Sequence, residues 1–194
     1  AEAEVGMRGR EQLVPRLVRA PWVTGAHVSA GLAAASHLIT GGTGGLGLLT
    51  GRWLAQLGAQ CITLSSRSGK LVWGSAAGEW EALQASGVAT AVSACDAAEC
   101  VDVRRLSSLC GGLRLGGVWH AAGMLADGLL LKQTAISLAR VYAPKSHGAW
   151  TLQLVAAGLP LRSCVLFSSV VALLGGGGQA NYSAANSCLD ALSG

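Results

Sequence analysis

Charge is scarce in this sequence. Asp, Glu, Lys and Arg together make up only 12% of its 194 residues, about half the usual share in a soluble protein. The 14 basic and 10 acidic residues give a net charge of +4, and the basic residues form no block or helical stripe of the kind that nucleic acid requires. We therefore expect no nucleic-acid partner, and the low charge indicates a chain that is mostly buried or part of something larger.

Cysteine pairs and groups of metal ligands are also missing. The six cysteines form no CxxC pair and no Cys/His cluster with the spacing of metal ligands. We expect no metal site, and we expect the thiols to be reduced and mostly buried. They occupy positions 61, 95, 100, 110, 164 and 188.

Long apolar runs are missing as well. The longest run, residues 164–174, is too short to span a bilayer and contains Ser168 and Ser169. Charged residues interrupt the first eleven positions, which is unlike the apolar stretch of a signal peptide. The sequence predicts a protein of a soluble, reducing compartment without a membrane partner.

Short apolar runs and glycine are what the sequence has in abundance. Residues 1–36 show no clear period and predict a linker or edge segment. From residue 37 to 194, apolar runs alternate with helix-like segments, which is typical of βαβ units. We predict an α/β fold, a Rossmann-like doubly wound parallel sheet with helices on both faces, C-terminally incomplete because no return strand follows. The expected strands are 37–40, 61–66, 88–96, 116–123 and 163–169, and the expected helices are 45–58, 79–86, 99–110, 145–157 and 178–192.

The glycine-rich segment TGGTGGLG, residues 40–47, follows the first expected strand and opens a helix. Three of its glycines fit the GxGxxG pattern of dinucleotide-binding proteins. In that pattern a pyrophosphate approaches the backbone and is held by helix N-terminal N–H groups. The candidate cofactor contacts of the loop are Gly42, Thr43, Gly44, Gly45, Leu46 and Gly47.

The end of the second expected strand bears on the choice of cofactor. NAD-binding proteins carry an acidic residue about 20 residues after the glycines, which holds the ribose 2′-hydroxyl. Here that place is taken by Ser66 and Arg67, and a guanidinium suits a 2′-phosphate. The sequence therefore favours NADPH over NADH. Asp96, at the end of the third strand, is a candidate for the adenine edge.

Four polar residues form a candidate reacting centre. Ser169 ends the fifth expected strand, and Tyr182 follows at the start of a helix, so their hydroxyls can polarise and protonate a carbonyl at the strand ends. A tyrosine is a reluctant acid–base group at neutral pH without a nearby cation, and Lys145 is the candidate. Asn186 follows Tyr182 by four residues, which places both on one helix face.

These segments together resemble the ketoreductase domains of polyketide synthases. The resemblance covers about residues 38–192 and rests on TGGTGGLG, LSSR, HAAG (residues 120–123), APK (143–145), LFSS and GQANYSAANSCLDAL. Ordinary short-chain dehydrogenases have a lysine four residues after the tyrosine, where this chain has Asn186. Polyketide and animal fatty acid synthase ketoreductases resemble this chain in having the lysine earlier, at the place of Lys145.

The resemblance implies NADPH-dependent reduction of a β-ketoacyl thioester, carried on an acyl carrier protein, within a multidomain synthase. Tyr182 would protonate the developing alkoxide and Ser169 would orient the carbonyl. Lys145 would favour ionisation of the tyrosine and bind the nicotinamide ribose, and Asn186 would hold the lysine or a relay water. The nicotinamide side would be lined by His120, Ala121, Ala122 and Gly123.

The resemblance also bears on stereochemistry. Type B members carry a Leu-Asp-Asp motif, of which Leu125 and Asp127 are present here, whereas type A members carry a Trp at the place of Leu174. Asp127 therefore favours type B, which gives a D-configured hydroxyl. The alternatives are a free-standing short-chain dehydrogenase, such as a discrete carrier-protein reductase or a nucleotide-sugar epimerase, and a non-catalytic cofactor-binding fragment. The missing YxxxK pattern counts against the free-standing enzymes.

Overall fold

The fold is built on a parallel sheet of five strands in the order β5-β4-β3-β6-β7. The computed structural model describes residues 6–8, 11–13, 32–71, 76–110 and 115–193. The strand order reverses between β3 and β6, so the sheet is doubly wound and Rossmann-like, as predicted. The strands are β3 (Ser36–Thr40), β4 (Cys61–Ser66), β5 (Ala89–Ala94), β6 (Leu115–His120) and β7 (Ser163–Leu166).

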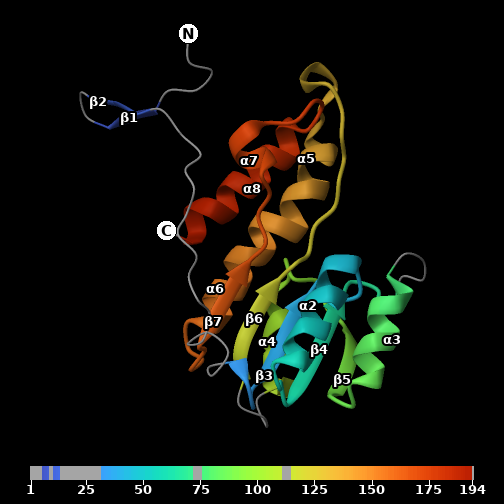
Figure 1. The fold of residues 1–194 in the computed structure, drawn as a ribbon. Coiled ribbons are helices and arrows are strands. Elements are labelled where there is room, and N and C mark those ends of the chain that lie inside the picture. Colours follow the sequence, from blue (N-terminus) through green and yellow to red (C-terminus); the bar gives the residue numbers. More distant parts are fainter. Residues whose placement is uncertain (1–5, 9–10, 14–31, 72–75, 111–114, 194) are drawn as a thin grey trace.

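Helices cover both faces of the sheet (Figure 1). Alternate residues of one strand serve opposite faces: in β3, Ile39 packs under α2 (Gly45–Gln56) and α3 (Ala77–Ala85), while Leu38 packs under α4 (Cys100–Cys110) and α6 (Gly148–Ala156). Val118 and Trp119 of β6 divide in the same way. Burial on both faces explains why the strands read as apolar runs without strict alternation.

The helical region after β6 is longer than the sequence predicts. The helix expected at 145–157 is preceded by the short 3₁₀ helix Leu130–Lys132, by α5 (Ala135–Tyr142) and by a π-helical turn at Ala143–His147, which leads into α6. A capping box formed by Thr134 and Ser137 starts α5. The expected helix at 178–192 is α8 (Ala180–Ser193), and α7 (Val171–Leu174) is an additional short helix.

The segment predicted as a linker or edge contains a small hairpin. Strand β1 (Gly6–Arg8) pairs antiparallel with β2 (Glu11–Leu13) in a two-stranded sheet of its own. The rest of the segment up to residue 31 lies outside the described residues.

The cysteines are less buried than predicted. All six are free, but only Cys95 and Cys110 are buried. Cys164 is exposed because β7 is an edge strand of the described sheet, and the other three are half-buried. In the described part of the chain, no helix has both the length and the apolar character needed to cross a membrane, and no three His, Cys, Asp or Glu side chains gather as metal ligands would.

Candidate active site

The phosphate loop lies where β3 ends and α2 begins. Gly41 has a φ of +69°, and a Cβ placed on it would lie 2.5 Å from the backbone N of Ala122. A Cβ on Gly47 would lie 2.5 Å from the carbonyl O of Gly41. Side chains are excluded at both positions because loop, helix and the segment after β6 meet there. Helix α2 begins without a capping side chain and without an acidic residue in its first turn, so its N–H groups suit an anion.

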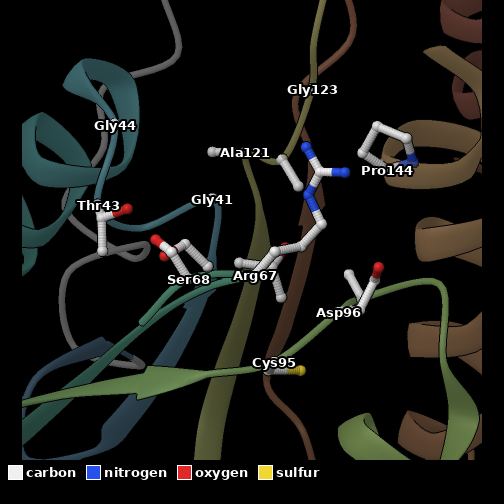
Figure 2. Close-up of a pocket in the computed structure, with 14 residues that line it drawn as sticks. Gly41, Thr43, Gly44, Arg67, Ser68, Cys95, Asp96, Ala121, Gly123 and Pro144 are labelled. Atoms are coloured by element: carbon white, nitrogen blue, oxygen red, sulfur yellow. The ribbon is translucent and has the colours of Figure 1, made fainter. Parts of the chain in front are cut away.

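A cavity of about 370 Å³ opens beside this loop, at the carboxyl ends of β3, β4, β5 and β6 (Figure 2). Arg67 extends its guanidinium into the cavity in Figure 2. The hydroxyl oxygen of Ser66 is buried at the wall and has no hydrogen-bond partner in the described part of the chain. Asp96 closes its own turn, since its Oδ1 accepts a hydrogen bond of 3.0 Å from the N–H of Ala98. The lining residues are Thr40, Gly41, Thr43, Gly44, Ser66, Arg67, Ser68, Cys95, Asp96, Ala97, Ala121, Ala122, Gly123 and Pro144.

Four loop residues predicted as cofactor contacts do not line this cavity. Gly42 is buried against β4, where a Cβ would lie 2.8 Å from the Cα of Leu64. Gly47 packs against the backbone of Gly41 and Gly42. Gly45 is not among the lining residues, and Leu46 lines a second cavity instead. Of the loop residues predicted as cofactor contacts, Thr43 and Gly44 line the first cavity.

The first cavity also contains residues that the sequence analysis did not select. Gly41 was missed because the GxGxxG frame begins one residue later; the alternative frame of Gly41, Gly45 and Gly47 includes it. Cys95, Ala97 and Pro144 carry no sequence signal, because only the fold brings them to the cavity.

His120, which was expected to line the nicotinamide side with the rest of the HAAG segment, is not among the lining residues of either cavity. Its ring is fully buried, and both ring nitrogens are hydrogen-bonded, to Thr40 Oγ1 at 2.6 Å and to the backbone O of Lys145 at 3.0 Å. Because side chains alternate along a strand, that of His120 points into the protein interior. The residues directly after β6, Ala121 to Gly123, line the cavity. Burial lowers the pKa of His120 to about 4, so the ring is neutral near pH 7.

Lys145, Asn186 and Tyr182 are brought together from the π-helical turn and α8. Lys145 Nζ donates to Asn186 Oδ1 at 2.7 Å and to the backbone O of Phe167 at 3.0 Å. The same Nζ lies 5.2 Å from the centre of the Tyr182 ring. Asn186 Nδ2 in turn donates to the backbone O of Tyr182 at 2.8 Å. The amide of Asn186 therefore holds the lysine with one atom and the tyrosine's turn of α8 with the other.

Burial controls the charge of this cluster. Only 4% of Lys145 is exposed, and desolvation lowers its pKa to about 8, partly opposed by the carboxylate of Asp190. A cation of this kind stays protonated at neutral pH but releases its proton more readily than an exposed lysine.

A second cavity, of about 240 Å³, borders the first at Ala121 and Gly123, which line both. Its walls also include Lys145, Tyr182 and Ser168. Ser169 is not among the lining residues, and its Oγ accepts a hydrogen bond of 3.4 Å from the N–H of Val171. The remaining lining residues are Leu46, Met124, Leu125 and Phe167.

Two loops are tied together beside this second cavity. Asp127 Oδ2 accepts a hydrogen bond from Gln179 Nε2 at 3.1 Å, and Asn181 Nδ2 donates to the backbone O of Ala126 at 2.8 Å. The backbone N–H of Gly128 adds a third bond, to the carbonyl O of Gly178. The loop that carries Asp127 is thus fixed to the segment that leads into Tyr182.

The doubly wound sheet and the glycine-rich loop beside the first cavity are typical of the Rossmann-like class of dinucleotide-binding folds, and comparison with known proteins identifies the family. A family model described as the KR domain matches residues 35–194. The chain therefore belongs to the KR family, the ketoreductase domains of polyketide synthases.

Two similar proteins of known name are polyketide synthases of Streptomyces halstedii. The chain is 38% identical over 196 residues to polyketide synthase GfsA, a match that covers 98% of this chain and 2% of that protein. It is 43% identical over 159 residues to polyketide synthase GfsB, covering 80% of this chain and 3% of that protein. The chain thus spans a small part of these much longer relatives.

Solved ketoreductases have the same fold. A structure titled as an A1-type ketoreductase matches with a TM-score of 0.85 and 37% identity, over 99% of this chain and 40% of the other. The first ketoreductase of the tylosin PKS matches with a TM-score of 0.78 and 34% identity, over 99% of this chain and 41% of the other. The chain therefore spans about 40% of the length of these solved relatives.

Proposed function

We propose that this chain binds NADPH and carries the residues that reduce a β-ketoacyl thioester to the β-hydroxyacyl form. The observation that supports this most is the cluster of Lys145, Asn186 and Tyr182, beside a cavity that shares Ala121 and Gly123 with the one at the phosphate loop. A cofactor site and a proton-donor site that share a wall are what a reductase needs.

The first cavity fits a dinucleotide phosphate. Its loop accepts no Cβ at Gly41, and its helix N-terminus has no capping side chain. Ser66, whose buried hydroxyl has no partner among the described residues, stands next to Arg67 in the lining. We assign the pyrophosphate to the loop and the 2′-phosphate to Ser66 and Arg67. Asp96 would face the adenine, and Ala121 to Gly123 the nicotinamide. When bound, NADPH supplies the hydride for the reaction.

The residues of the second cavity complete the reaction. As hydride adds to the carbonyl carbon, the π electrons of the C=O bond move to oxygen, and Tyr182 donates its hydroxyl proton to that oxygen. Lys145 stabilises the tyrosinate left behind by its positive charge and holds the nicotinamide ribose. Asn186 keeps the ammonium in place. Ser169 orients the carbonyl, which requires its hydroxyl to turn from Val171 N–H toward the cavity.

The partners proposed for this activity are an acyl carrier protein, which presents the thioester, and the other domains of a synthase. We also propose the D-configured product of type B, since Asp127, two residues after Leu125 of the second cavity, is held by Gln179 and Leu174 takes the place of the type A tryptophan. Two solved relatives are titled as A-type, so chiral analysis of the hydroxyacyl product is the test of this point. An L-configured product would refute it.

The direct test is NADPH oxidation by the complete protein with a β-ketoacyl N-acetylcysteamine thioester. Tyr182→Phe removes the proton donor but keeps the ring, so we expect turnover to fall by at least about 100-fold while the NADPH Kd changes little. Tyr142→Phe, at the end of α5 and outside both cavity linings, is the matched control. Equal turnover by wild type and Tyr182→Phe would contradict the mechanism.

A further inference from the structure

The buried ring of His120 connects the two halves of the site. His120 is the last residue of β6, and its Nδ1 lies 2.6 Å from the hydroxyl of Thr40, at the end of β3 where the phosphate loop begins. Its Nε2 lies 3.0 Å from the backbone O of Lys145. We call these two hydrogen bonds the His120 bridge. Both ends belong to the candidate site, because Thr40 lines the first cavity and Lys145 the second.

Chemistry fixes the direction of both bonds. A carbonyl oxygen only accepts, so Nε2 must carry the proton that it donates to Lys145 O. With the pKa of His120 lowered to about 4 by burial, the ring carries one proton near pH 7, and Nδ1 is an acceptor. The hydroxyl of Thr40 therefore donates to Nδ1. The hydroxyl proton of Thr40 thus points toward the His120 ring.

The local backbone is shaped around this ring. Lys145 lies in the π-helical turn Ala143–His147, an irregular stretch that changes the direction in which its carbonyl points. Gly148 follows directly, and a Cβ there would lie 2.9 Å from His120 Cε1. Only glycine allows the ring to come this close to the start of α6. The bridge thus depends on three parts of the chain that are far apart in the sequence: Thr40, His120 and residues 143–148.

We infer that His120 is a positioning residue that fixes the position of Lys145 relative to the phosphate loop. The inference rests on the proposed function, and it assigns the histidine a role at a distance from the reacting atoms. If the Lys145 backbone shifts, Nζ moves relative to Tyr182 and Asn186, and a displacement of about 1 Å at such a site costs on the order of 100-fold in rate. The same ring holds Thr40, so cofactor binding and lysine placement are coupled.

Two amide variants separate the two bonds. His120→Asn keeps an acceptor near the position of Nδ1 for Thr40 but does not reach Lys145 O. His120→Gln keeps a donor near the position of Nε2 for Lys145 O but leaves Thr40 without its acceptor. In the complete protein we expect His120→Asn to lower kcat by about tenfold or more with little change in the NADPH Kd. We expect His120→Gln to raise the NADPH Kd several-fold with a smaller loss in kcat.

The matched control is His37, a second buried histidine of the same sheet. It is 1% exposed, its Nε2 lies 2.9 Å from the backbone O of Leu32, and its Nδ1 accepts a hydrogen bond from Trp119 Nε1 at 3.2 Å. It lines neither of the two cavities of the site. His37→Asn and His37→Gln lose comparable buried hydrogen bonds, so they report a purely structural loss. The inference fails if the variants at the two histidines change kcat and Kd in the same way.

A second readout needs no enzymatic activity. The rate at which acetic anhydride modifies Lys145, followed by mass spectrometry across pH, reports the surroundings of Nζ. These are the carboxylate of Asp190, the Tyr182 ring, the Asn186 amide and the Phe167 carbonyl. We expect the pH midpoint of labelling to shift in His120→Asn and to stay at the wild-type value in His37→Asn. An unchanged midpoint in His120→Asn overturns the inference.

These results keep the two proposals apart. A wild-type protein that neither binds NADPH nor reduces a thioester refutes the proposed function, while the labelling experiment still tests the role of the His120 bridge.

If the His120 variants do not fold, Thr40→Val and Thr40→Ser replace them. Thr40→Val keeps the side-chain volume but cannot donate to Nδ1, and Thr40→Ser restores the donor. We expect several-fold weaker NADPH binding in the valine variant and wild-type binding in the serine variant; equal Kd values in both overturn the inference.

Discussion

Asn186 accepts a hydrogen bond of 2.7 Å from Lys145 Nζ with its Oδ1, and its Nδ2 donates at 2.8 Å to the backbone O of Tyr182. Asn186 is fully buried, and Lys145 nearly so. A buried ammonium needs polar partners, because an unpartnered one would be strongly disfavoured. The asparagine therefore makes a buried lysine possible beside the tyrosine.

Replacing Asn186 by alanine is predicted to impair the reaction more than cofactor binding. Among the described residues, the variant leaves Lys145 Nζ with the Phe167 carbonyl as its remaining hydrogen-bond partner, so we expect kcat to fall by about 10- to 100-fold. Steady-state kinetics with NADPH and the model thioester measure this. Ser187→Ala, on the exposed side of the same helix, is the control. Equal kcat values for Asn186→Ala and wild type would show that the amide is dispensable.

Arg67 is predicted to select NADPH over NADH. Without its guanidinium, the charge-assisted bonds to a 2′-phosphate are lost, at about 1.5–3 kcal/mol each. Arg67→Ala should therefore raise the NADPH Kd by at least about tenfold and leave the NADH Kd nearly unchanged, as measured by fluorescence titration. Lys70→Ala, three residues further on and outside the cavity lining, controls for the general loss of positive charge. A parallel weakening of both cofactors would refute the role of Arg67 in the choice.

The two glycines near the start of α2 should differ sharply in their tolerance of alanine. A Cβ on Gly47 would lie 2.5 Å from the backbone of Gly41, whereas a Cβ on Gly45 has no atom within 4 Å. Gly47→Ala should lower the free energy of unfolding by about 2 kcal/mol or more through overpacking, and should weaken cofactor binding. Gly45→Ala should be nearly neutral. Denaturant unfolding of both variants measures the difference, and similar losses would contradict this packing of the loop.

The strands and the reacting residues could be predicted because each depends on local sequence or on chemical need. Each apolar run ends at a turn, and the strand ends of a parallel sheet share one edge, which indicates where the site lies. Asn186 could be expected beside Tyr182 from its spacing of four residues on a helix, and Lys145 from the tyrosine's need for a cation and from the resemblance to ketoreductases. Helix α5 was missed although its residues are amphipathic, because it is only eight residues long and its start is not obvious in the sequence. The capping box of Thr134 has Ser137 at the position where Glu or Gln gives the recognisable motif.

The His120 bridge could not be predicted from the sequence. It depends on a π-helical turn at residues 143–147 and on the close approach allowed by Gly148, and neither has a periodic or compositional signature. Ser169 shows the opposite case. Its spacing from Tyr182 made it the candidate, yet the structure places the neighbouring Ser168 in the lining of the second cavity. Spacing identifies a segment, whereas the geometry at the end of the strand decides which of its residues line the cavity.

The buried charge of Lys145 is predicted to make stability depend on pH. Its pKa is lowered from 10.5 to about 8 in the folded protein, so between these values the unfolded chain binds more protons than the folded one. The free energy of unfolding should therefore rise as pH increases from about 8 to 10.5, and the cost of burying the charge is fully present below pH 8.

Lys145→Met removes this cost. Relative to wild type, the variant should be more favoured at about pH 7 than at about pH 10 by about 2 kcal/mol. Urea unfolding at the two pH values measures the difference, with Lys132→Met at an exposed site as the control. A difference between variant and wild type that is the same at both pH values would show that Lys145 keeps an ordinary lysine pKa in the folded protein.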